Sequence, residues 1–255
     1  MEDGTALHTL LLGTGTEIVR VGADDWRPEW AREKRDRIRA DGGVPVLARR
    51  IPALYDCAQA ARAQLVEHPA CPGLFGEGKS EATLIWKAGR ARTWCRARVD
   101  WLPDDSSLPI YDFKFTRGSA APADWERHVW QTHAVQGEFY LRGVTALRKH
   151  RPPGIRFVVI EMDAPYGVTV LSPAADAMQR AKALVDDALE RWAVALKTGT
   201  WPGYPRQVGY VELPGWMVQR AGEAAWEREQ RRHCPTMAEV EHVHAMSARL
   251  GGPLS

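Results

Sequence analysis

Residues 92–116 read RTWCRARVDWLPDDSSLPIYDFKFT, and this stretch decides the fold class. Its two runs, 92–102 and 108–116, alternate or concentrate apolar residues, and the polar turn 103–107 separates them, which predicts a β-hairpin. A third strand is predicted just before it, at 80–87 (SEATLIWK). Because side chains alternate along a strand, each hairpin strand should present an apolar face to the core and a charged face opposite.

Helices are predicted on both sides of this β section. Apolar residues at helical spacing, or strong charge, mark the helical segments 4–12, 27–41, 52–68, 122–147, 172–197 and 214–231. In the fifth of these, Ser172 is the expected N-cap, with Pro173 at the first helical position. Two further strands are predicted at 155–163 and 166–171.

This order of elements predicts an α/β or α+β fold, in which a central mixed β-sheet is flanked by helices. We expect a single domain over residues 1–255. It should consist of an N-terminal helical part (1–79), a core (80–171) and a C-terminal helical part (172–255).

The composition is that of an ordinary globular protein, with 45% hydrophobic and 26% charged residues. No apolar run approaches the roughly 20 residues of a membrane helix. The first four residues are acidic where a signal peptide would be basic. We therefore expect a cytoplasmic protein without a membrane partner. The net charge of +2 indicates no polyanion partner, although basic residues cluster locally at Arg90, Arg92, Arg96 and Arg98.

The cysteines do not form a metal-binding pattern. Iron–sulfur clusters held by four cysteines usually show close pairs such as C-x-x-C. Here all the cysteines are more than ten residues apart: Cys57, Cys71, Cys95 and Cys234. We expect no iron–sulfur cluster and mostly buried, unpaired thiols.

Alternation assigns the hairpin side chains to two faces. In the first strand Cys95, Ala97, Val99 and Trp101 should share the apolar face, opposite Arg96, Arg98 and Asp100. In the second strand Tyr111, Phe113 and Phe115 should lie opposite Asp112 and Lys114. A turn centred near residue 105 places Asp100 beside Asp112, with Lys114 one pleat further on.

Two carboxylates opposite each other in a sheet are destabilising, but a divalent cation between them removes the repulsion. Carboxylate oxygens suit Mg²⁺ or Mn²⁺. A bound metal polarises a phosphoryl oxygen and activates a water, while a nearby lysine orients that water and stabilises charge on the phosphate. Asp100, Asp112 and Lys114 are therefore predicted to support phosphodiester hydrolysis.

The two-letter pattern Asp-x-Lys is weak by itself. Residues 77–79 (EGK) fit the related Glu-x-Lys pattern, but their glycine-rich surroundings do not predict a strand, so we favour Asp112 and Lys114. Asp104 and Asp105 are interpreted as turn formers. Gln136 and Tyr140 lie four residues apart on the long helix and share a face, which fits either a site wall or an exposed polar patch.

The ordered set of motifs resembles the PD-(D/E)XK core of RecE-type, exonuclease VIII-like exonucleases of phages and prophages. The stretches that carry the resemblance are GTALH (4–8), SEATLIW (80–86), CRARVDWL (95–102), YDFKFT (111–116), QGEFY (136–140), WPGY (201–204) and LPGW (213–216). The resemblance covers nearly the whole chain and implies a restriction-endonuclease-like core.

The resemblance also implies roles for individual residues. Asp100 and Asp112 would hold the metal with the main-chain carbonyl of Phe113, and Lys114 would be the catalytic lysine. His8 would be a further metal ligand, and Glu81 matches an acidic position before the core strands. Gln136 and Tyr140 would face the site and touch the nucleic acid. From the residues themselves, Arg96 and Arg98 are expected on the DNA path, with pairing to the site carboxylates as the competing role.

The function that the resemblance implies is a Mg²⁺-dependent exodeoxyribonuclease, with Mn²⁺ as a substitute, that digests one strand of duplex DNA from its ends, 5′ to 3′. Such enzymes act in phage-type homologous recombination in a bacterial cell, as homo-oligomers beside a single-strand annealing protein. Two alternatives stay open: a structure-specific or Cas4-like endonuclease, and a non-catalytic DNA-binding module on the same scaffold. Some of the eleven tryptophans are candidate base-stacking platforms, but the sequence does not identify them.

Overall fold

The structure is a computed structural model, and it describes residues 2–204, 206–210, 222–223 and 225–226. The chain divides into two compact units, Met1–Trp201 and Pro202–Ser255. In the second unit, residues 222–223 and 225–226 are helical. Most of the helix predicted at 214–231, the motif at 213–216 and Cys234 lie outside the described residues.

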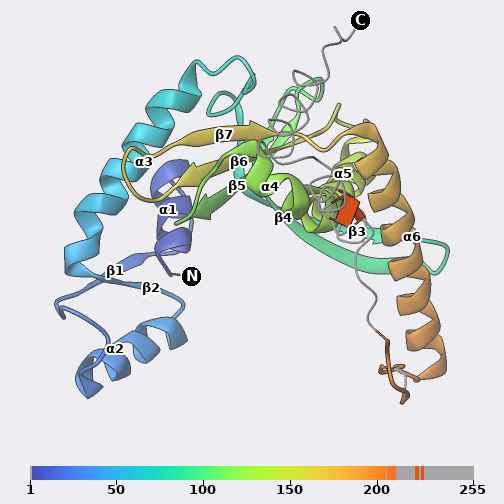
Figure 1. The fold of residues 1–255 in the computed structure, drawn as a ribbon, viewed down its shortest axis with the longest axis horizontal. Helices are drawn as coiled ribbons and strands as arrows, with labels where there is room; N and C mark the ends of the chain where they lie inside the picture. The colour runs from blue at the N-terminus through green and yellow to red at the C-terminus, as the bar shows by residue number, and fades with distance from the viewer. Residues whose placement is uncertain (1, 205, 211–221, 224, 227–255) are drawn as a thin grey trace, which may run out of the picture. The chain divides into compact units, whose positions relative to one another are not determined.

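The centre of the first unit is a five-stranded mixed sheet with the strand order β3-β4-β5-β6-β7 (Figure 1). Its strands are β3 (Gly78–Ala88), β4 (Thr93–Pro103), β5 (Ile110–Thr116), β6 (Ile155–Glu161) and β7 (Val168–Leu171). Strands β5 and β6 are parallel, and the other neighbouring pairs are antiparallel. With helices on both faces, this confirms the predicted fold class.

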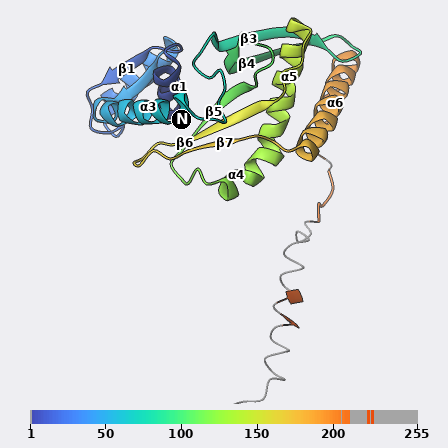
Figure 2. The same ribbon diagram turned by 90° about the horizontal axis from the view of Figure 1, so that it is seen from above.

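Two hydrophobic cores lie on opposite faces of this sheet. Tyr111 and Phe113 of β5 pack into a core with α1 (Glu2–Leu12) and α3 (Ile51–Val66). Ile110, their neighbour in β5, packs into a second core with α5 (Ala134–Arg148). The helix α6 (Ala175–Thr198) lies against α5 on that face (Figure 2). Because adjacent residues of a strand point to opposite faces, the sheet separates the two cores.

The predicted faces of β4 are wrong at one end of the strand. Cys95, Ala97 and Val99 belong to the core under α5, whereas Trp101 belongs to the core under α1. The change coincides with Glu81 of β3, which lies opposite Asp100 and interrupts the ladder between the pairs Ser80↔Trp101 and Ala82↔Val99. Glu81 has a φ of 51°, and such a local distortion re-aims the side chains that follow.

The N-terminal part, which was predicted to be helical, contains helices and also a pair of strands that was not predicted. Strands β1 (Ile18–Val21) and β2 (Val44–Leu47) form a separate parallel pair, connected through α2 (Glu29–Ala40). Residues of β1, β2 and α2 share a small core. Each strand has four residues, which is too short for an alternation to stand out in the sequence.

Two helix predictions also need correction. The long helix at 122–147 consists of α4 (Pro122–His128), a π-helical turn η2 (Val129–His133) and α5. The helix α6 begins at Ala175, and its N-cap residue Ala174 makes no side-chain cap bond. Ser172 instead donates its hydroxyl hydrogen to the main-chain oxygen of Ile155 at 3.2 Å, which holds it beside β6. A short 3-10 turn, η1 (Ala48–Arg50), precedes α3.

Within the described residues, we find no helix with both the length and the apolar character needed to cross a bilayer.

Candidate metal centre

The candidate site lies where β4 and β5 lose their regular pairing. Among the described residues, the two strands are registered at Trp101↔Tyr111, and continuing this register places Asp100 opposite Asp112. The main-chain amide of Phe113 donates a hydrogen bond to Asp100 Oδ2 at 2.7 Å. The Asp100 carboxylate, only 9% exposed, therefore links the two strands through its side chain. Both strands are buried here, so the carboxylate is held rigidly.

Three potential metal ligands converge at this point. One ligand atom from each of His8, Glu81 and Asp100 lies within 4.8 Å of the other two. His8 comes from α1, and its Nδ1 lies 3.7 Å from Asp100 Oδ2. That nitrogen is buried and has no hydrogen-bond partner among the described residues. A buried polar atom without a partner is costly, so the arrangement favours a bound group that would satisfy it.

The environment of His8 keeps its imidazole neutral. Burial, aided by the positive charges of Lys114 and Arg98, lowers the pKa of His8 to about 4. The ring meets the aromatic ring of Phe115 edge-on, with 5.0 Å between centroids. A neutral imidazole held in place offers a lone pair at pH 7, and one nitrogen with carboxylate oxygens is a suitable donor set for a divalent cation.

Glu81 occupies a more central position than the sequence indicated. Its left-handed φ is unusual for a residue with a side chain, and such strained conformations cluster at functional sites. Its carboxylate forms an ion pair with Arg98, with 2.8 Å between Glu81 Oε2 and Arg98 Nε. Arg98 thus shows the competing role, pairing with a site carboxylate. The register of β3 against β4 places Glu81 opposite Asp100.

A second cluster surrounds Asp112 on the α5 side of the sheet. Asp112 is 2% exposed and forms an ion pair with Lys114. Gln136 of α5 donates from Nε2 to Asp112 Oδ1 at 2.6 Å and to the hydroxyl oxygen of Tyr140 at 3.0 Å. Lys114 Nζ in turn donates to Gln136 Oε1 at 3.1 Å. The structure thus brings Asp112, Lys114, Gln136 and Tyr140 into one hydrogen-bonded group.

Burial disfavours the ionised form of both aspartates. Burial raises the pKa of Asp100 well above its usual value, and the negative charge of Asp112 raises it further. Burial also raises the pKa of Asp112, although Lys114 and Gln136 oppose that shift. A divalent cation would stabilise both ionised carboxylates. His8, Glu81 and Asp100 therefore fit a metal as the side chains that would hold it. Asp112 lies outside this group of three, and its role as a metal ligand stays a prediction.

Other predicted residues are placed less centrally. Phe113 separates Asp112 from Lys114 in β5, and its ring lies in the core under α1. The role of its carbonyl as a metal ligand stays a prediction. Arg96 is exposed on β4, opposite Ile85 of β3. The cysteines Cys57, Cys71 and Cys95 are buried.

The segment 77–79 was predicted to lie outside a strand, which is correct for Glu77 and wrong for Gly78 and Lys79. Gly78 and Lys79 begin β3, where they pair with Pro103 and Leu102. A Cβ on Gly78 would lie 2.8 Å from the Leu102 oxygen, so glycine is required here by close packing of the two strands. The side chains of Glu77 and Lys79 are exposed.

His133, which is not among the predicted site residues, lies beside this cluster in the turn η2. Burial, the charge of Lys114 and the charge of His128 lower the pKa of His133 to about 4, while a hydrogen bond with Gln136 opposes the shift. Its ring stacks on Trp125, with 5.8 Å between centroids. Turns of π-helix often occur at functional sites, but π-helical geometry leaves no clear sequence pattern.

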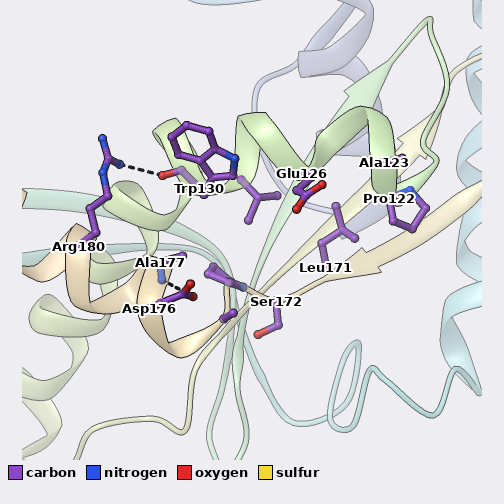
Figure 3. Close-up of a pocket in the computed structure, with 12 residues that line it drawn as sticks. Pro122, Ala123, Glu126, Trp130, Leu171, Ser172, Asp176, Ala177 and Arg180 are labelled. Carbon is purple, nitrogen blue, oxygen red and sulfur yellow. Dashed lines mark hydrogen bonds between the residues drawn. The ribbon is translucent and has the colours of Figure 1, made fainter. Parts of the chain in front are cut away.

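A separate cavity of about 760 Å³ lies between α4, η2 and the start of α6 (Figure 3). At its rim Arg180 donates to the main-chain oxygen of Trp130 at 3.1 Å, and its guanidinium lies 5.6 Å from the Trp130 ring centroid. None of the predicted site residues is among those that line it.

Comparisons with known proteins add one structural likeness. No model of a protein family matches the sequence, and no curated protein matches it either. Among solved structures, the chain is similar to a crystal structure from Eubacterium rectale described as a "Putative exonuclease". The likeness covers 73% of this chain and 71% of that one, with 12% sequence identity and a TM-score of 0.45. Functional roles are therefore assigned from this chain's own residues.

Proposed function

We propose that this chain is a metal-dependent phosphodiester hydrolase of the PD-(D/E)XK type that acts on DNA. The observation that carries the proposal is the pairing of Lys114 with Asp112 directly across the strand gap from Asp100. Carboxylates that need a cation, next to a lysine ammonium, provide the groups that phosphodiester hydrolysis requires. The neutral imidazole of His8 adds a ligand that a merely structural ion pair would not need.

Each residue has a separate task in this proposal. Asp100, Asp112, Glu81 and His8 would hold Mg²⁺ or Mn²⁺, which supplies polarisation of a phosphoryl oxygen and a lowered pKa for a bound water. Lys114, held by Asp112 and Gln136, places a positive charge where negative charge grows on the phosphate. Gln136 orients both residues: its Oε1 accepts a hydrogen bond from Lys114, and its Nε2 donates one to Asp112.

We infer further that the substrate is duplex DNA with a free end. This inference, together with 5′ to 3′ digestion and a role in recombination, rests on the resemblance to RecE-type exonucleases. The homo-oligomer and the single-strand annealing partner stay predictions from the same resemblance. Of the two predicted arginines, Arg96 is exposed beside Gln136 and Tyr140 and would approach the DNA backbone, whereas Arg98 pairs with Glu81.

The experiment compares purified protein on linear duplex DNA and on covalently closed circular DNA of the same sequence. With Mg²⁺ we expect the linear DNA to be digested from its ends and the circle to stay intact, and a chelator should abolish digestion. Intact linear DNA would contradict the proposal and favour the non-catalytic module. Cutting of the circular DNA would contradict the exonuclease assignment and support the endonuclease alternative.

A further inference from the structure

A groove of about 470 Å³ adjoins the candidate metal centre between β4, α5 and α6. Gln136 and Tyr140 line this groove and also belong to the hydrogen-bonded group around Asp112. The groove is therefore continuous with the place where a scissile phosphate would lie. We name it the β4–α6 groove.

The walls of the β4–α6 groove carry exposed aromatic rings. Trp94 of β4 is 68% exposed, and Trp192 of α6 is 52% exposed. On α6 the lining residues recur at helical spacing: Val185, Ala188, Leu189 and Trp192. Val185 is buried, so this stripe begins in the core and ends in solvent at Trp192. The ring of Trp192 contacts the ring of Trp201 in an edge-on arrangement, with 5.0 Å between centroids, so a base would stack on the part of Trp192 that stays exposed.

The charge of the groove suits a nucleic-acid strand. Within the part of the chain that the structure describes, its lining includes Arg96 and no carboxylate. Lys87 lies at the Trp94 ring, with its Nζ 4.5 Å from the ring centroid. Aromatic rings beside positive charges are the means by which proteins hold single-stranded nucleic acid, with the bases stacked and the backbone paired to cations.

We propose that the β4–α6 groove binds unpaired bases of the DNA strand whose phosphate lies at the metal centre, with Trp94 and Trp192 as the stacking platforms. This inference rests on the proposed function, and it implies that the duplex is opened next to the cut. A peptide segment is the other class of occupant for an apolar groove. The arginine, the lysine and the shared wall with the metal centre favour DNA.

The test uses the full chain and a short single-stranded oligonucleotide containing 2-aminopurine, whose fluorescence falls when the base stacks. Affinity is measured without divalent metal, and kcat and KM are measured on linear duplex DNA with Mg²⁺. Trp192→Ala and Trp94→Ala should each weaken oligonucleotide binding about 5- to 100-fold and reduce the quenching. Both should raise KM more than they lower kcat, and Trp192→Phe should restore part of the affinity.

The matched control is Trp30→Ala, because Trp30 of α2 is also 52% exposed and lies outside the groove. It should bind and cut like the original chain. Unchanged oligonucleotide binding in both groove variants would overturn the inference. That result is also the one expected if the groove holds a peptide segment instead of DNA. A chain that cuts linear duplex but whose groove variants bind normally refutes the groove alone. A chain that cuts no DNA refutes the proposed function, while the binding measurements still decide the groove.

Discussion

Replacing Lys114 by alanine is expected to lower the rate of linear-duplex cleavage about 100- to 1,000-fold, the usual cost of removing one group that stabilises transition-state charge. The ammonium of Lys114 is fixed from two sides, by Asp112 and by Gln136. Among the described residues, no other lysine forms an ion pair with the site carboxylates, and the cation of Arg98 is paired with Glu81. Asp112→Ala should reduce cleavage at least as far, because it also removes a metal ligand. The rate is measured on end-labelled DNA with Mg²⁺ in excess.

Alanine in place of Lys114 also leaves Asp112 buried without its cation, which lowers stability. Lys114→Gln separates the two effects, since it retains a hydrogen-bonding group but lacks the charge. Both variants should show this loss of cleavage rate while their thermal unfolding stays cooperative. Lys79→Ala and Glu77→Ala are the matched controls, because they change the similar but exposed pattern at the start of β3 and just before it, and both variants should cut normally. Normal cleavage by the Lys114 variants would refute the catalytic assignment.

Asp100→Asn should make the metal-free protein more stable and abolish its response to Mg²⁺. Asp100 is buried, and its pKa is raised by burial and by Asp112, so its ionised form is disfavoured in the folded state. Asparagine removes the charge, while its oxygen can still accept the hydrogen bond from the Phe113 amide. Each pKa unit of such a shift corresponds to about 1.4 kcal/mol. A change of 1 kcal/mol moves the unfolding temperature by about 2–4 °C in a domain of this size.

The sign of the pH dependence follows from the same shift. A carboxyl group with a raised folded-state pKa binds more protons in the folded state than in the unfolded state. Its contribution therefore falls as pH rises from the unfolded value of about 3.9 through the raised folded value. The stability gain of Asp100→Asn should accordingly be larger at pH 8 than at pH 4.

Thermal unfolding with and without Mg²⁺ measures both effects. The original chain should gain unfolding temperature when Mg²⁺ is added, because a ligand that binds the folded state stabilises it. The Asp100→Asn variant should show little or no such gain. If Asp100→Asn destabilised the metal-free protein and kept the Mg²⁺ response, Asp100 would be a structural residue instead of a metal ligand.

The sheet was predictable because its strands carry strong local patterns. The runs that became β3 to β7 are apolar or alternating, and from β3 to α6 the predicted order of elements matches the observed one. The parallel pair β1 and β2 was missed because each strand is short and their pairing depends on a crossover through α2. The position of Trp101 was missed because one residue in a neighbouring strand, Glu81, changes the course of β4.

The site shows a similar division. Asp100, Asp112 and Lys114 could be selected from strand alternation, and Gln136 and Tyr140 from helical spacing. The convergence of His8 and Glu81 on Asp100 depends on tertiary packing of α1 against β5 and on a backbone distortion in β3. Neither is encoded in a local pattern. The buried, unpartnered nitrogen of His8 becomes informative only when its surroundings are known.

The most direct test of the metal centre is a crystal of the full chain grown with Mn²⁺ and measured for anomalous scattering. We predict a manganese peak at the gap between β4 and β5, within bonding distance of carboxylate oxygens of both Asp100 and Asp112. Coordination by His8 Nδ1 or by the Glu81 carboxylate would complete the predicted ligand set. A manganese-free site, with Asp100 and Asp112 protonated or bonded only to protein groups, would contradict the central claim.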